Sequence, residues 1–147
     1  MAYTERVSEV NAPLATIYSD VRIPGTHYSE FVSLENYHRA FLLLSVSEMA
    51  ALSTVDAGIQ QASDVTGTGV KAITGKTITQ LTQAAGDTNS LVCIELQTEE
   101  LDVDNDFEFI RFYVTNAVNS VNFEGILFGC SPRYKPVPTT NWAEIVG

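Results

Sequence analysis

The sequence predicts an all-β protein, an antiparallel β-sandwich of jelly-roll-like type with an extended N-terminal arm and a proline-rich C-terminal tail. Two observations support this fold class. From Thr26 onward, short apolar runs rich in β-branched and aromatic residues are separated by clusters of Gly, Asn, Asp and Ser. The only segments that could form helices are short. We therefore expect an arm over residues 1–25, a sandwich over residues 26–130 and a tail over residues 131–147.

The N-terminal segment shows no sustained period and carries Pro13, Pro24 and Gly25. It reads as an extended arm with at most one strand. Such an arm often becomes ordered only against a neighbour.

The clearest strand is Val55 to Gln60, where apolar and polar residues alternate as a half-buried strand requires. Three other runs are apolar on successive residues: Ala40 to Leu44, Leu91 to Ile94 and Ile126 to Phe128. Such runs are typical of strands that are buried on both faces or that form a subunit contact.

The longest predicted strand, Phe107 to Asn116, is apolar on both faces. Ile110, Phe112 and Val114 share one face, and Phe107, Phe109, Arg111 and Tyr113 share the other. Two apolar faces indicate a second packing partner, although aromatic residues that fill the core explain the pattern equally well. The candidates for self-association are Phe107, Phe109, Tyr113 and Phe128.

Two short segments could be helical. Ser47 to Leu52 could make one turn, and Thr77 to Ala85 is predicted to be strand first and turn afterwards. The tail holds Pro132, Pro136 and Pro138, which exclude regular pairing over most of Ser131 to Thr140. With Tyr134 and Trp142, this tail is a candidate for lying across a neighbour.

The charge balance limits the kinds of partner. Among 147 residues, 18 are acidic and 8 are basic, a net charge of −10. This argues against nucleic acid and anionic membranes as partners, since both need clustered Lys and Arg. Neither a membrane span nor a signal peptide is recognisable. We expect synthesis in a host cytoplasm, with the protein kept there or packed into a particle assembled there.

The segment Gly69 to Thr77 ends in the Gly-Lys-Thr of phosphate-binding loops. It has five residues between its glycines, where that loop has four, and it follows a polar stretch and precedes a predicted strand. A Gly/Thr-rich turn is therefore expected, and no nucleotide site.

The acidic run Glu99 to Glu108 spaces Asp102, Asp104 and Asp106 as the start of many calcium loops does. Phe107 and Tyr113 occupy the places where an EF-hand loop needs Gly and Glu. A solvated acidic loop between two strands is the favoured interpretation, and calcium held in another geometry is the weaker alternative. The negative surface of this region would suit a basic partner.

No catalytic constellation is recognisable. His27 and His38 lie in no nucleophile context, and Cys93 and Cys130 lie in apolar runs where free, buried thiols are expected. We expect no enzyme activity, no cofactor and no zinc site.

Four short blocks are Ile59 to Asp64, Gly69 to Lys76, Glu99 to Asp102 and Pro132 to Pro136. Together they resemble a group of small proteins encoded beside the major capsid protein in tailed bacteriophages. The resemblance covers about Phe41 to Pro136. It implies a virion protein similar to capsid decoration or cement proteins, with the major capsid protein as partner and no catalytic residues.

The leading hypothesis is a dimeric or trimeric protein that binds the capsid exterior and reinforces contacts between major capsid subunits. One alternative is a head–tail connector or tail subunit, which would form a single ring. The other is a carbohydrate-binding β-sandwich, which needs exposed aromatics beside carboxylates in a cleft. The predicted capsid contacts are the arm Ala2 to Ile23 and, in the tail, Pro132, Arg133, Tyr134, Lys135, Pro136 and Trp142.

Overall fold

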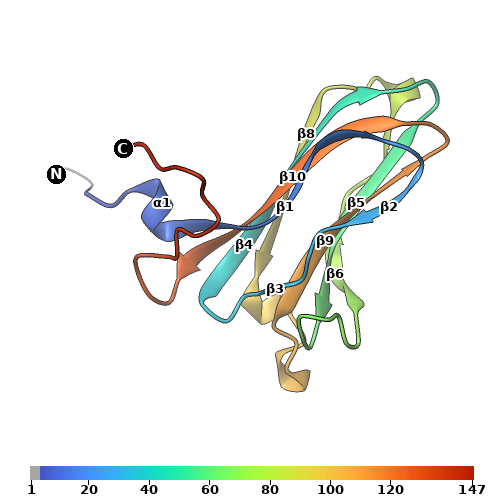
Figure 1. Cartoon of the computed structure of the whole chain (residues 1–147). Helices are drawn as coiled ribbons and strands as arrows, with labels where there is room; N and C mark the ends of the chain where they lie inside the picture. Colours follow the sequence, from blue (N-terminus) through green and yellow to red (C-terminus); the bar gives the residue numbers. More distant parts are fainter. Residues whose placement is uncertain (1–3) are drawn as a thin grey trace.

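The computed structural model describes residues 4–147 as two antiparallel sheets packed face to face, which confirms the predicted β-sandwich (Figure 1). The four-stranded sheet has the order β1 (Asn11–Arg22), β10 (Val121–Pro132), β4 (Tyr37–Met49) and β8 (Ser90–Gln97). The six-stranded sheet has the order β2 (Gly25–Tyr28), β9 (Phe109–Ala117), β5 (Thr54–Ala62) and β6 (Lys71–Thr77). Two short strands complete it: β3 (Val32–Ser33) pairs with β9, and β7 (Leu81–Thr82) pairs with β5.

The strand order is that of a jelly roll. When β3 is counted with β2, and β7 with β6, the described chain has eight strand segments. The first pairs with the last (β1 with β10), the second with the seventh (β2 with β9), the third with the sixth (β4 with β8) and the fourth with the fifth (β5 with β6). This nested pairing is a long hairpin rolled into two facing sheets.

Alternation along the strands builds the core between the sheets. In β5, the side chains of Val55, Ala57 and Ile59 are buried, as the sequence predicts. In β9, Ile110, Phe112 and Val114 are buried, while the residues between them are only partly covered. They meet the inner face of the four-stranded sheet, which contributes Leu42, Leu44, Val46, Phe123 and Leu127.

The expected N-terminal arm is largely a strand. Asn11–Arg22 forms the edge of the four-stranded sheet, and Ala12, Ala15 and Ile17 belong to the core. Pro13 is tolerated because an edge strand needs to pair on one side only, and the register shifts beside it. Residues 11–22 therefore belong to the sandwich. Ala2, at the start of the predicted contact segment, lies outside the described residues.

The helical prediction for Ser47 to Leu52 is wrong. β4 continues to Met49, which pairs with Val121, and the chain then turns at Leu52 with a positive φ of 63°. Cross-strand pairing decides the conformation here. For Thr77 to Ala85 the prediction of strand followed by turn is confirmed only in part: β6 ends at Thr77, residues 78–80 are not in a strand, and the short β7 leads into a 3-10 turn, η1 (Gln83–Ala85).

The remaining helical pieces are single turns: α1 (Val7–Val10), η2 (Thr98–Glu100) and η3 (Val103–Asn105). Within residues 4–147, no helix is long and apolar enough to cross a membrane.

Candidate protein-binding surfaces

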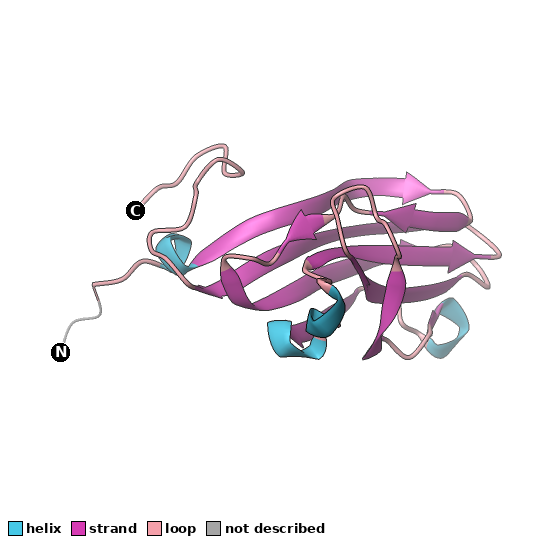
Figure 2. Ribbon diagram, turned by 90° about the horizontal axis from the view of Figure 1, so that it is seen from below, coloured by secondary structure: helices cyan, strands magenta, loops and turns pink. Residues whose placement is uncertain are grey.

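The described N-terminal segment, from residue 5, and the C-terminal tail lie together at one end of the sandwich, where β10 ends and β1 begins (Figures 1 and 2). We call residues 5–10 and 133–147 the terminal module. The amide of Val137 donates to the Glu9 carbonyl at 3.2 Å, and Lys135 Nζ pairs with Glu5 Oε1 at 2.5 Å. The tail therefore lies across the chain's own N-terminal segment.

Val137 anchors the tail to the sandwich. Its side chain is 3% exposed and belongs to the core cluster. Further along, the Asn141 amide donates to the Pro13 carbonyl at 2.8 Å, which fixes the tail to the edge strand β1. The tail is thus a docked segment with a defined path.

The predicted capsid contacts divide into two groups. Pro132 is the last residue of β10 and pairs with Tyr37, and Arg133 Nε donates to the Glu35 carbonyl at 2.8 Å, so both serve the sandwich. Tyr134 is 78% exposed, and Lys135, Pro136 and Trp142 lie in the terminal module.

The terminal module also exposes apolar side chains that belong to no core. Val7 and Val146 are among the most exposed apolar residues of the described chain. The module encloses a mainly apolar hollow of about 600 Å³, lined by residues 5–8, Trp142 and residues 144–147. The indole N–H of Trp142 is buried without a hydrogen-bond partner in the described structure.

The outer face of the four-stranded sheet is apolar at its centre. The registers of β10, β4 and β8 place three side chains in each row across the face. Rings of Phe41 and Phe128 stack there with centroids 4.9 Å apart, and Leu91 is 71% exposed. We call the apolar members the sheet patch: Phe41, Leu43, Leu91, Cys93, Ile126 and Phe128.

Charged residues lie at the rim of the sheet patch. Arg39 lies in the row next to that of Phe41 and Phe128. Glu124 lies at the opposite end of the patch, in the same row as Leu91, and Glu95 pairs with Phe41 at the β8 edge. All three charged residues are exposed, and none forms an ion pair within residues 4–147.

On the outer face of the six-stranded sheet, Arg111 contacts two aromatic rings and one glutamine side chain. Its guanidinium carbon lies 3.9 Å from the ring centroid of Tyr28 and 4.6 Å from that of Phe31, and its Nε donates to Gln60 at 3.0 Å. Cation–π contacts and this hydrogen bond satisfy the guanidinium at the surface. This face is therefore more polar than the sheet patch.

The predicted self-association residues do not form one surface. Phe128 belongs to the sheet patch, while Phe109 and Tyr113 lie on the outer face of the six-stranded sheet. Phe107 precedes β9, and its ring lies 4.1 Å from Lys71 Nζ. The other members of the sheet patch lie in the three runs of successive apolar residues, for which the sequence left burial on both faces and a subunit contact as alternatives: Phe41, Leu43, Leu91, Cys93 and Ile126.

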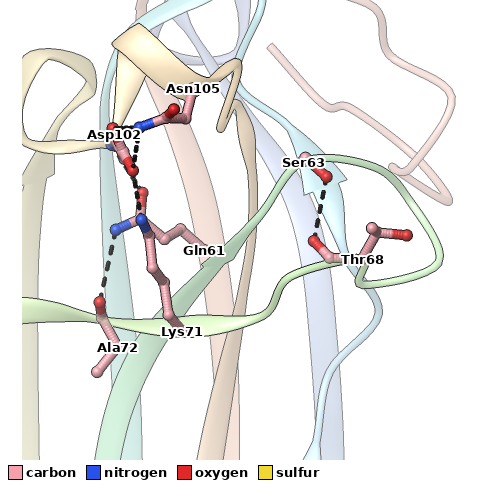
Figure 3. Close-up of polar contacts among 7 residues, drawn as sticks. All are labelled: Gln61, Ser63, Thr68, Lys71, Ala72, Asp102 and Asn105. Carbon is pink, nitrogen blue, oxygen red and sulfur yellow. Dashed lines mark hydrogen bonds and ion pairs between the residues drawn. The ribbon is translucent and has the colours of Figure 1, made fainter.

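The acidic loop between β8 and β9 is fastened to β6 (Figure 3). Lys71 forms an ion pair with Asp102, and Asn105 donates to the same carboxylate at 2.8 Å. Buried Gln61 links the two segments, since its Oε1 accepts from the Asp102 amide at 2.8 Å and its Nε2 donates to the Ala72 carbonyl.

These contacts lower the pKa values of two loop carboxylates. The bond from Lys71, then that from Asn105, lowers the pKa of Asp102. The Gln97 amide, then Lys76, lowers the pKa of Glu100. Both carboxylates therefore stay ionised near neutral pH, and the charges of Lys71 and Lys76 offset part of the negative charge of the loop. Within residues 4–147, no three potential metal ligands are gathered, so the calcium hypothesis for Asp102, Asp104 and Asp106 gains no support from the geometry.

The Gly-Lys-Thr segment is part of β6. Lys76 lies on this strand and pairs with Glu100 at 2.9 Å. Where a turn was expected, residues 71–77 pair with β5 across a register shift. Because Lys76 pairs with Glu100 and lies on a strand that opens no helix, residues 69–77 do not have the geometry of a phosphate-binding loop.

Both cysteines are free thiols, but only Cys130 is substantially covered. Burial raises the pKa of Cys130 to about 11. Cys93 is exposed on β8, contrary to expectation, because the outer face of the four-stranded sheet has no covering layer in this chain. His27 bonds to Asn116 at 3.2 Å, and His38 is exposed.

A groove runs along the seam between edge strands β1 and β2. It comprises two adjoining hollows of about 350 and 550 Å³ that share Thr16, Tyr18 and Tyr28. Tyr18 is 78% and Tyr28 50% exposed, and Glu30 lines the first hollow. From the sequence, only Trp142 was a candidate for an exposed aromatic residue. The groove with Tyr18 and Tyr28 was not predicted, because these tyrosines come together only when the two sheets pack.

Comparison with known proteins gives little. No protein-family model and no curated protein matches the sequence. Among solved structures, a chain from "Structure of infectious bursal disease virus Gt strain" is similar over 84% of this chain and 42% of that chain, with 8% identity and a TM-score of 0.30. This chain thus spans less than half of that one, and a likeness at this TM-score does not establish a common function.

Proposed function

We propose that the protein is a structural component of a tailed-phage virion that binds the outside of the capsid as a decoration protein. It would bind through the terminal module and stabilise contacts between major capsid subunits. The observation that carries this proposal is the joining of both chain ends into one exposed, apolar structure at one end of the sandwich. The proposal includes no catalytic step.

The terminal module has the features of a contact surface. An interface needs apolar anchors at its centre, and aromatic residues supply much of the binding energy. Tyr134 offers such an anchor, and the apolar hollow beside Trp142 could receive a side chain of the capsid protein. Because Val137 and Asn141 hold the tail in place, little further ordering is needed on binding.

The jelly-roll order supports the proposal as an analogy. Viral capsid and lectin domains use this architecture, and a fold by itself does not fix a function. A protein that binds only the assembled shell stabilises that shell by mass action, in proportion to the logarithm of its concentration over its dissociation constant.

The test is co-sedimentation of the purified protein with capsids that lack it, with bound copies counted per major capsid subunit. A number comparable with that of the capsid subunits is the expected result. A single ring of copies would favour the connector or tail alternative. An absence of binding to capsids would contradict both.

Matched variants locate the contact. Tyr134→Ala should weaken capsid binding by about tenfold or more, because a buried aromatic anchor is lost. Leu52→Ser is the control, since this exposed apolar residue lies beyond the end of β4 that is distant from the module. Truncation after Trp142 is preferable to removal of Pro136 to Gly147, which would also remove the core residue Val137.

A second candidate function, carbohydrate binding, is favoured by the groove between β1 and β2. Exposed tyrosine rings beside a carboxylate fit the faces and hydroxyl groups of sugars. Titration with neutral glucose and N-acetylglucosamine oligosaccharides, followed by NMR shifts of the two tyrosines, tests it. Shifts of Tyr18 that are lost in Tyr28→Ala would support this function, and unchanged spectra would remove it for these sugars.

A further inference from the structure

The sheet patch is an apolar sheet face that no other part of the described chain covers. An exposed, contiguous apolar face indicates an interaction site. The register arranges its centre in ordered rows: Phe128, Phe41 and Glu95; Ile126, Leu43 and Cys93; and Glu124, Ser45 and Leu91.

We propose that a second copy of this chain covers the sheet patch, so that two four-stranded sheets pack face to face in a two-fold dimer. This surface is separate from the terminal module, and the dimer does not depend on the capsid proposal. The charges at the rim of the patch favour a second copy as the partner.

Charge is distributed along the patch in a self-complementary way. Arg39, in the row with Cys130 and Gln97, lies on one side of the rows of Phe41 and Leu43, and Glu124 lies on the other; Glu95 stands at the β8 edge of the Phe41 row. A two-fold interface pairs a surface with itself, so opposite charges at opposite ends become neighbours. A basic partner would instead bring its cations against Arg39, which has no carboxylate partner within residues 4–147.

The packing follows from a two-fold axis that lies between the sheets and runs across the strands, midway between the rows of Phe41 and Leu43. Each strand then lies over its own copy in the opposite direction. Phe41 meets Leu43 of the partner subunit, and Arg39 reaches the row of the partner's Glu124. Arg39 lies over Ser45 of the partner subunit, which pairs with Glu124, and neighbouring strands are about 4.8 Å apart, within reach of an arginine side chain. Aligned sheets pack in this way at about 10 Å.

The test measures mass by light scattering during gel filtration, from low to high micromolar concentration. The full-length chain should change from monomer to dimer over this range. Leu43→Asp should weaken the dimer roughly a hundredfold or more, because a carboxylate would be buried without a partner. Cys93→Asp gives a second variant that cannot unfold the core, since Cys93 is already exposed, and it places a carboxylate against Glu95 of the partner subunit. Leu52→Asp is the control and should dimerise normally.

A charge exchange tests the two-fold arrangement directly. Arg39→Glu should weaken the dimer about tenfold by placing like charges together, and Arg39→Glu combined with Glu124→Arg should restore it. A chain that stays monomeric at all concentrations would overturn the proposal. So would a dimer that survives Leu43→Asp and Cys93→Asp, or a double exchange without rescue. Capsid binding is measured separately by co-sedimentation, so a failure of the dimer proposal can be distinguished from a failure of the capsid proposal.

Discussion

The rings of Phe41 and Phe128 stack across β4 and β10 on the outside of the sandwich, with centroids 4.9 Å apart and an angle of 18° between the rings. Phe112, on the opposite sheet, is sealed in the core at 0% exposed. The three phenylalanines therefore have different roles, which a stability measurement can separate.

Truncation of the two kinds of phenylalanine should have unequal costs. Phe112→Ala leaves a cavity between the sheets and should lower the free energy of unfolding by about 3–5 kcal/mol. Phe41→Ala removes one partly exposed ring of a stacked pair and should cost about 0.5–1.5 kcal/mol. Urea denaturation at low protein concentration, where the monomer predominates, measures both. Equal losses would contradict the assignment of Phe41 to the surface.

Gly125 gives the Phe112 ring its space. A Cβ at this position would lie 2.8 Å from Phe112 Cε2. Gly125→Ala should therefore destabilise the protein by about 1–3 kcal/mol through overpacking. In an unobstructed strand the same change would be stabilising, because alanine restricts the unfolded chain. A raised melting temperature would show that the ring can move aside.

Gln61 should be the main polar link between β5 and the acidic loop. Replacement by Ala leaves the Asp102 amide and the Ala72 carbonyl without their partner, at a cost of about 1–3 kcal/mol. Gln97→Ala is the control, because that side chain is exposed and should change stability by less than about 0.5 kcal/mol. Proteolysis within residues 98–108 should increase in the Gln61 variant alone.

Asp64 should make stability depend on pH. Hydrogen bonds from Thr68 and Thr66 hold the pKa of Asp64 well below its ordinary value. A lowered pKa in the folded state means that the stabilisation is present above the unfolded pKa of about 3.9 and is lost as the pH falls below it. The wild type should be more stable than Asp64→Asn near neutral pH, and the difference should shrink below about pH 4.

The control for this measurement is Asp20→Asn, since Asp20 is an exposed carboxylate on β1 without a side-chain hydrogen bond in the described structure. It should show no such convergence. A constant difference between wild type and Asp64→Asn at all pH values would contradict the role of the Asp64 charge.

The two thiols should react at different rates. Burial raises the pKa of Cys130 to about 11, so little thiolate is present near neutral pH. Burial and the charge of Glu95 raise the pKa of Cys93 as well, but its side chain is exposed. At low protein concentration, where the monomer predominates, maleimide should label Cys93 faster than Cys130, as single Cys→Ser variants and mass spectrometry can show. Faster labelling of Cys130 would contradict the described burial.

Local pattern was sufficient to predict several elements. Alternation in Val55 to Gln60 identified β5, and the two-faced run ending at Asn116 identified most of β9, because a strand's side-chain period is a property of the chain itself. The successive apolar residues around Leu43 and Ile126 indicated strands with two apolar faces. The acidic loop was also found from sequence, though its ion pairs with β6 were not.

The sequence by itself determined the fold class, the core positions of β5 and β9, and that the spacing of Gly69 and Gly75 differs from that of a phosphate-binding loop. All of these features follow from residues that are close to one another in the sequence. Only the tertiary structure decided that Asn11–Arg22 is a strand, that Tyr18 and Tyr28 share a groove and that Phe128 lies apart from Phe109 and Tyr113. The reason is physical: a jelly roll pairs the first strand with the last, and the contacts between segments so distant in sequence depend on a register that no local pattern encodes.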